Sequence, residues 1–125
     1  MTSPFRKTIN EICKTLPGAE WSDPWDGGHD AWKVGDKMFA CMGSMSEGVS
    51  VKCPDVETAA LLIEAGVAEK APYFHKSWVR FVEDADEDAD EDELKARINQ
   101  SYDLVRAKLP TKVRKELAER QEETD

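Results

Sequence analysis

The chain has 125 residues, of which 40% are hydrophobic and 34% are charged, and its formal net charge is −9. This length and balance predict one globular domain over residues 1–125, with a core large enough to fold without disulfides or metal ions. No apolar run approaches the roughly 18 residues of a membrane span, and the polar amino terminus lacks the apolar core of a secretory signal. We therefore expect a cytoplasmic protein with no membrane partner.

The first predicted element is a helix. Ser3 and Pro4 are typical of a helix start, and Pro17 with Gly18 is typical of a helix end. Between them, apolar residues recur at intervals of three and four, which places one face of the helix against a core: Phe5, Ile9, Ile12, Cys13 and Leu16.

Four strands are expected next. Trp21 and Trp25 mark the first, and the dipeptide Gly35-Asp36 predicts a tight hairpin between strands at 31–34 and 37–42. The fourth strand has a strict alternation, which predicts one face toward the core and one toward water. The core-facing residues are Val49, Val51 and Cys53, and the water-facing residues are Ser50 and Lys52.

Helices dominate the second half of the chain. Asp55 opens a second helix, ended by Gly66, whose apolar residues at helical spacing are Val56, Ala59, Ala60 and Ile63. A loop leads into a fifth strand at 78–82, and a long amphipathic helix ends at Pro110 after the stripe Leu94, Ile98, Tyr102, Val105 and Leu109. A short last helix carries Val113 and Leu117, and a frayed tail follows from about residue 118. The order predicts an α+β fold, an antiparallel sheet of about five strands with helices packed on it.

The charge is unevenly distributed. Residues 83–93 contain nine acids and no base, whereas residues 94–120 contain eight bases and three acids. The acidic stretch does not fit a calcium loop, because a loop starting at Asp84 places Ala89 where glycine is required and Lys95 where the last acid is required. We expect an acidic, solvated linker at 83–93 that opposes phosphate binding by the basic segment directly beside it, and no metal site.

Reactive side chains form no catalytic pattern. Cys13, Cys41 and Cys53 include no Cys-x-x-Cys pair, so buried free thiols are expected. His29 is expected in a solvent-facing turn, and His75 lies in an aromatic loop at 72–78. The chain has no phosphate loop, dinucleotide fingerprint or nucleophile elbow. We expect no cofactor, and a non-enzymatic role is favoured over an enzyme.

Five short segments occur in a characteristic order: Leu16–Trp21, Asp30–Ala40, Val49–Cys53, Pro72-Tyr73 with Lys76 and Trp78, and Ser101–Val105 with Leu109-Pro110. In this order they resemble the MmcQ/YjbR family of small bacterial proteins, over about residues 5–115. The resemblance implies a fold similar to the bacterial frataxin homologue, and a role in DNA binding through a double-wing arrangement. Ser77 stands where many members of the family carry a histidine.

Two functional hypotheses follow. The first is weak DNA binding, with these candidate contact residues: Lys33, Lys37, Lys52, His75, Lys76 and Arg80. The alternative is a protein-interaction module that docks through the aromatic loop at 72–78. A continuous basic face would favour the first hypothesis, and an exposed apolar groove would favour the second. A deep polar pocket would instead favour an enzyme whose site is nonlocal in sequence.

Overall fold

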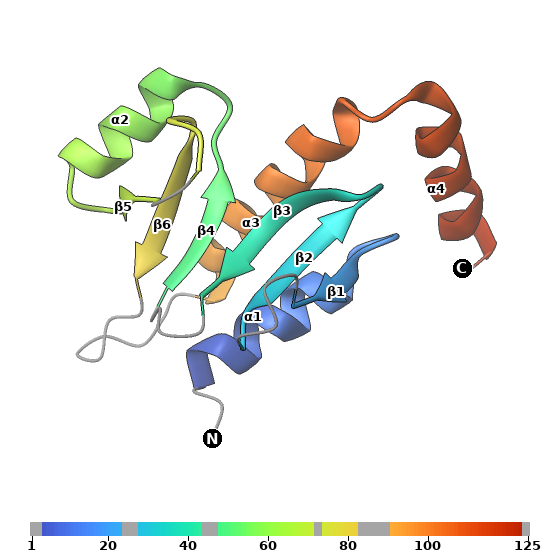
Figure 1. Ribbon diagram of the computed structural model, residues 1–125, viewed down its shortest axis with the longest axis horizontal. Helices are drawn as coiled ribbons and strands as arrows, with labels where there is room; N and C mark the ends of the chain where they lie inside the picture. The colour runs from blue at the N-terminus through green and yellow to red at the C-terminus, as the bar shows by residue number, and fades with distance from the viewer. Residues whose placement is uncertain (1–3, 24–27, 44–47, 72–73, 83–90, 124–125) are drawn as a thin grey trace.

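The computed structural model describes residues 4–23, 28–43, 48–71, 74–82 and 91–123, and has the predicted α+β class. Figure 1 shows the elements in chain order. The helices are α1 (Pro4–Lys14), α2 (Val56–Glu64), α3 (Glu91–Ala107) and α4 (Thr111–Glu123). The strands are β1 (Glu20–Ser22), β2 (Asp30–Val34), β3 (Lys37–Met42), β4 (Gly48–Lys52), β5 (Glu69–Lys70) and β6 (Trp78–Val82). No described helix is long and apolar enough to cross a membrane.

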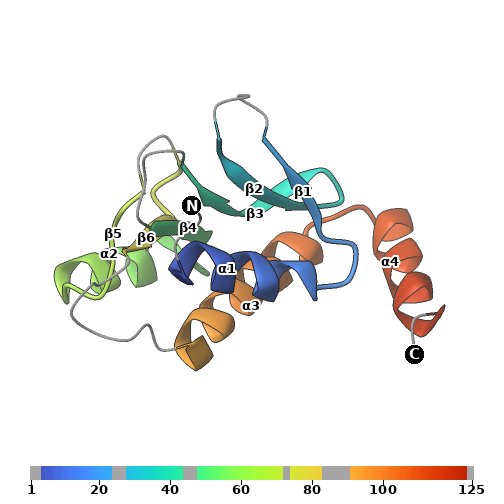
Figure 2. The same ribbon diagram turned by 90° about the horizontal axis from the view of Figure 1, so that it is seen from below.

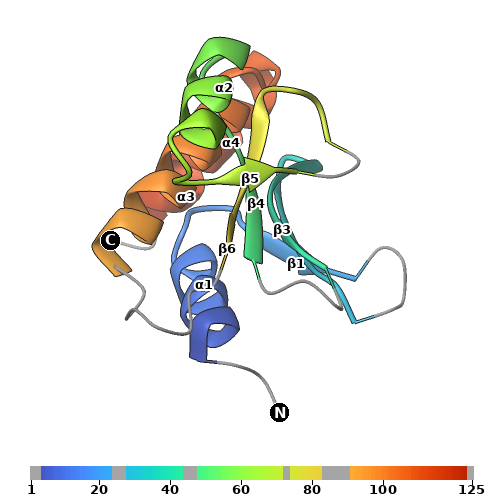
Figure 3. The ribbon, with the colours of Figure 1, turned by 90° about the vertical axis from the view of Figure 1, so that its left-hand side faces the viewer.

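The described strands form one antiparallel sheet in the order β1-β2-β3-β4-β6-β5. Helix α3 packs on β2, β3 and β4, α1 packs on α3, and α2 packs on β5 and β6. Figures 2 and 3 show these three helices on one side of the sheet. We call this side the helix face and the opposite side the open face.

The turn between β2 and β3 confirms the hairpin prediction. Gly35 and Asp36 have φ angles of 55° and 66°, the left-handed values that a two-residue hairpin turn requires at both positions. A Cβ atom on Gly35 would lie 2.7 Å from Leu109 Cδ1 and 3.1 Å from Val113 Cγ1. The glycine therefore lets the hairpin pack against the segment between α3 and α4.

The sheet has one more strand than the sequence predicted. Strand β5 has only two residues, both polar, so it carries no apolar alternation that could mark it. Strand β1 contains Trp21 as predicted, whereas Trp25 lies outside the described residues.

The alternation in β4 is confirmed on the helix face and partly wrong on the open face. Val49, Val51 and Cys53 are each at most 2% exposed. Ser50 points to the open face but is only 5% exposed, because Cys41 and Arg80 lie opposite it on the neighbouring strands. Alternation predicts which face a side chain takes, and the neighbouring strands decide whether water reaches it.

The apolar residues at helical spacing in α2 do not all face the core. Ala59 is fully buried and Leu62 packs against the core, whereas Val56 and Ile63 are 43% and 38% exposed. The helix is apolar on most of its circumference, so spacing alone did not distinguish its inner side from its outer side.

The stripe predicted on α3 is buried along its whole length, with Leu94, Ile98, Tyr102, Val105 and Leu109 in the core. The helix begins at Glu91, so the last three residues of the acidic stretch form its first turn, and residues 83–90 lie outside the described residues. Helix α4 continues to Glu123, past the expected tail boundary, because residues 111–123 contain strong helix formers and no Gly or Pro.

Candidate nucleic-acid interface

Three of the six predicted contact residues lie on the open face. Val51 and Val79 point to the helix face. Lys52 and Arg80, which follow them in their strands, therefore point to the open face. Lys33 takes the same side in β2, between the buried Trp32 and Val34. The three residues come from three different strands of one face.

Acidic residues oppose two of these three bases. Arg80 Nη2 donates to Glu69 Oε2 at 2.8 Å across the β5–β6 pair. Lys33 lies opposite Glu20 in the β1–β2 register. Since a phosphate near either base would also meet a carboxylate, the open face does not form the continuous basic surface that the DNA hypothesis required.

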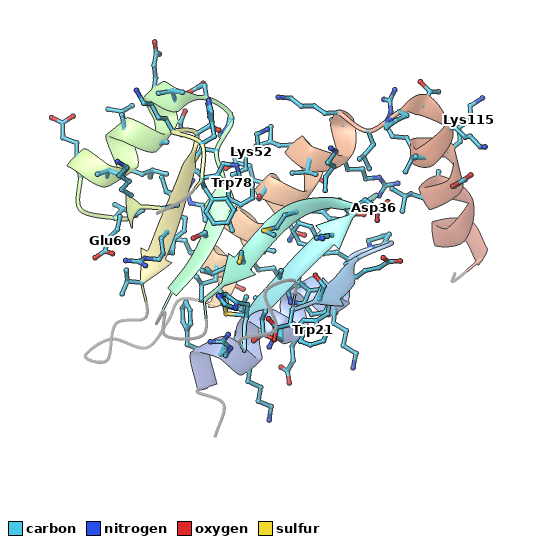
Figure 4. The ribbon with its side chains drawn as sticks, viewed as in Figure 1. Trp21, Asp36, Lys52, Glu69, Trp78 and Lys115 are labelled. Atoms are coloured by element: carbon cyan, nitrogen blue, oxygen red, sulfur yellow. The ribbon has the colours of Figure 1, made fainter. Side chains whose placement is uncertain are left out.

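Lys52 has a different environment, at the carboxyl end of β4. Burial lowers the pKa of Lys52, and the neighbouring ammonium of Lys108, just past α3, lowers it further. Among the described residues, neither lysine forms an ion pair with a carboxylate. Figure 4 labels Lys52 at the upper end of β4. The fold thus holds two uncompensated positive charges side by side.

A buried serine fixes this part of the fold. Ser101 Oγ donates to the carbonyl of Phe39 at 2.6 Å and accepts from the backbone N–H of Lys52 at 2.9 Å. Ser101 is fully buried on α3, two helical turns before Lys108. The serine therefore joins β3, β4 and α3 beside the lysine pair.

The aromatic loop enters the same end of the sheet. The N–H of Cys53 donates to the carbonyl of Ser77 at 2.7 Å, which holds the loop beside the end of β4. Within the loop, Phe74 and Trp78 stack with ring centroids 4.6 Å apart. Figure 4 shows Trp78 near Lys52, its partner in the β4–β6 register. Lys76 is exposed, so it adds a third ammonium group near this end.

The His75 ring is held by its own loop. The backbone N–H of Ser77 donates to His75 Nδ1 at 3.1 Å, and Ser77 Oγ lies 2.9 Å from the same nitrogen. Because Nδ1 accepts a bond from a backbone amide, the neutral ring carries its proton on Nε2. This leaves an N–H donor on an exposed side chain, next to Lys76.

The hairpin brings further lysines to this end. Lys37 is exposed in the first position of β3, and the hairpin packs against Leu109 and Val113 through Gly35. Helix α4 therefore starts beside it, with Lys112 and Lys115 exposed. We call the group at this edge the basic end; its members are Lys37, Lys52, Lys76, Lys108, Lys112 and Lys115.

The acidic stretch is attached at the opposite end of the sheet. Val82 precedes it and pairs with Gly48 at the start of β4, while Glu91 begins α3. At 1.5 Å per residue, α3 carries the chain about 25 Å from Glu91 to Lys108, against a screening length of about 8 Å. Asp92 and Glu93 in the first turn of α3 therefore lie close to Lys95 and far from Lys108 along the helix. The other acids of the stretch, at 83–90, lie outside the described residues, so the expectation that they oppose the basic segment stays a prediction.

Sequence reasoning missed a polar network at the other end of β2. Asp30 accepts bonds from Arg6 Nε at 2.5 Å and Trp21 Nε1 at 2.6 Å, and Asn10 Nδ2 lies 3.4 Å from it. Burial alone would raise the pKa of Asp30, but the three donors outweigh it and hold the pKa below its ordinary value. Trp32 Nε1 extends the network to Asn10 Oδ1 at 2.9 Å. The network fastens α1 to the sheet and has no sequence signature, since its members are scattered along the chain.

Other reactive groups form no further site in the described part of the chain. Cys13, Cys41 and Cys53 are buried free thiols, as predicted. Burial raises the pKa of Cys13 to about 12 and that of Cys41 to about 11. No group of three or more His, Cys, Asp or Glu among the described residues could hold a metal ion.

The comparisons agree with the family resemblance. The YjbR family model matches residues 14–104. The chain belongs to the YjbR family. The crystal structure of the Deinococcus radiodurans protein DR2400, a DUF419 domain, superposes with a TM-score of 0.77 at 24% identity, covering 94% of this chain and 92% of that one. At this identity, DR2400 shows the fold of the YjbR domain alone. A comparison with curated proteins gave no match.

Proposed function

We propose that this YjbR-family domain binds double-stranded DNA weakly, by contacting phosphates with its basic end. The observation that carries the proposal is the pairing of Lys52 with Lys108, which come from distant parts of the chain. Two ammonium groups held together repel each other, and a phosphate placed between them would remove that repulsion.

The contact residues differ from those expected from the sequence alone. Lys37, Lys52 and Lys76 remain, and the other members of the basic end join them: Lys108, Lys112 and Lys115. His75, an exposed side chain whose Nδ1 accepts from a backbone amide, adds an N–H donor on Nε2 at the same end. Lys33 and Arg80 are left out, because Glu20 and Glu69 oppose them.

Ammonium groups contact phosphates without reading bases, so binding should be independent of sequence and sensitive to salt. We expect dissociation constants on the order of 10⁻⁴–10⁻⁶ M at physiological salt, the range of non-specific binding. The direction of α3 supports this mode, since the basic end would meet the duplex while Glu91, where the helix begins, lies about 25 Å from Lys108 along its axis.

The test is a titration of the full chain with a random-sequence duplex at several salt concentrations. Lys52→Gln/Lys108→Gln should reduce the slope of log K against log salt by about 2, since each lost phosphate contact removes about 0.9. Lys7→Gln/Lys95→Gln is the matched control, because it removes the same charge from exposed sites on α1 and the start of α3. Equal slopes for the two variants, or no binding of the wild type at low salt, would refute the proposal.

The alternative hypothesis, docking through the aromatic loop, receives less support at that position. Phe74 and Trp78 stack on each other and are partly buried, so the described part of the loop, residues 74–78, offers little free apolar surface. Among the described residues, the six exposed large hydrophobic side chains lie elsewhere, three of them on α2.

A further inference from the structure

Helix α2 exposes apolar side chains on the side that faces away from the sheet. Six large hydrophobic residues are exposed in the described part of the chain, and three of them lie on this nine-residue helix: Val56, Leu61 and Ile63. A fourth, Val67, follows just past the helix end and is 47% exposed. Figure 3, viewed from the β5 edge of the sheet, shows α2 at the outer edge of the molecule. Such a concentration in so short a segment is typical of an interaction surface.

Val56 and Ile63 share one side of the helix with the exposed Ala60, whereas Leu61 lies about 100° beyond Ala60. At 100° per residue, Val56, Ala60 and Ile63 fall within about 60° of one another, roughly a quarter-turn from the buried Ala59 and Leu62. We call these three residues the outer stripe. Asp55 caps the helix by accepting from the N–H of Thr58 at 2.6 Å, so the stripe begins on an ordered first turn.

The charged residues of α2 and its two flanking segments have one sign. Residues 53–69 contain four acids, Asp55, Glu57, Glu64 and Glu69, and no base. Glu57 and Glu64 lie beside the stripe on the helix surface, are exposed, and form no ion pair with another described residue. A partner for this surface must therefore be apolar where it meets the stripe and positive at its margin.

We propose that the outer stripe of α2 docks a basic amphipathic helix of another protein, with aliphatic side chains against Val56 and Ile63 and Lys or Arg beside Glu57 and Glu64. Helix-in-groove recognition uses this combination of apolar anchors and flanking charge. The inference is independent of the DNA proposal, because it uses neither the basic end nor its lysines.

The same charges disfavour other occupants. A second copy placed stripe to stripe would bring Glu57 and Glu64 against their own counterparts. Helix α4 of a second copy is basic, but its apolar residues Val113 and Leu117 already pack in its own core. An anionic membrane surface would be repelled by the acidic margin.

The probe is a helical peptide of leucine and lysine arranged with helical periodicity. Its controls are a scrambled peptide of the same composition and an amphipathic peptide of leucine and glutamate. The two lysine peptides carry equal charge, so non-specific attraction to the acidic protein contributes equally to both. We expect the amphipathic lysine peptide to bind the full chain roughly tenfold more tightly than the scrambled one, and the glutamate peptide not to bind.

Variants assign the site. In Val56→Gln/Ile63→Gln, the two lysine peptides should bind with equal affinity. In Glu57→Gln/Glu64→Gln, the amphipathic lysine peptide should bind more weakly, and its affinity should depend less on salt. Val82→Gln is the matched control, since Val82 on β6 is 42% exposed, like Val56, and it should leave binding unchanged. Thermal melts of each variant confirm folding, and amide chemical shift changes on binding should centre on residues 55–67.

Several outcomes would overturn the proposal. These are equal binding of the amphipathic and scrambled peptides, an unchanged affinity in Val56→Gln/Ile63→Gln, or shift changes centred outside residues 55–67. A concentration-dependent dimer lost in that variant would identify a second copy as the occupant instead. Binding to anionic vesicles lost in the same variant would identify a membrane surface.

Discussion

Ser101→Ala should be among the most destabilising single-atom deletions in this fold. The hydroxyl is fully buried and bridges two strands, donating to the Phe39 carbonyl and accepting from the Lys52 N–H. Phe39 is the extra residue at the irregularity between β2 and β3, where Trp32 pairs with Ala40 and Lys33 with Met38. Its carbonyl accepts from the Ser101 hydroxyl at this irregularity.

The magnitude follows from what remains after the hydroxyl is removed. Alanine leaves one buried acceptor and one partly buried donor without partners, and each unsatisfied group costs about 1–3 kcal/mol. Allowing for partial solvation of the Lys52 amide, we expect the free energy of unfolding to fall by about 3 kcal/mol. For a domain of this size, that corresponds to a decrease in Tm of about 10 °C.

Urea unfolding at neutral pH, followed by circular dichroism, measures this change. Ser77→Ala is the matched control, because Ser77 is also buried but its hydroxyl contacts only the exposed His75 ring, which can turn to water. We expect a cost below about 1 kcal/mol there. If the free energy of unfolding of Ser101→Ala lies within about 0.5 kcal/mol of the wild-type value, the serine bridge does not hold the strands to α3.

Three further predictions concern other parts of the fold. Val51→Asp should unfold most of the population by burying an unpaired carboxylate, whereas Lys52→Asp should cost little because it removes repulsion from Lys108; near-equal thermal melts would refute the β4 register. Gly35→Ala should cost about 1–3 kcal/mol, since its φ is positive and a Cβ would meet Leu109 at 2.7 Å; an unchanged urea midpoint would contradict this. Asp30→Asn should destabilise the protein at pH 7, and the difference from wild type should shrink as pH falls below about 4 through the lowered pKa of Asp30, because the carboxylate stabilises the fold only when ionised; a pH-independent difference in urea unfolding would exclude this origin.

The sequence by itself determined the local features of the domain. The Gly35-Asp36 turn needs two left-handed residues in succession, which few other residue pairs adopt, so its sequence identifies the turn. The buried stripe on α3 and the core face of β4 were also predictable. The apolar residues of α3 recur with the period of a helix and those of β4 with the period of a strand, and each pattern leaves a single side apolar. The family resemblance was also carried by segments that each lie within a few residues of chain.

The tertiary structure alone decided the features that bear on function. Periodicity could not orient α2, since apolar residues occupy most of its circumference and only packing on β5 and β6 selects Ala59 and Leu62 for the core. Glu69 neutralises Arg80 because a two-residue strand with no sequence signal pairs beside it. Lys108 reaches Lys52 because the length of α3 and its contact with β4 set where the helix ends. Pairings of this kind depend on the order of strands in the sheet and on helix packing. Both arise from the burial of many residues together, so no single residue in the sequence predicts them.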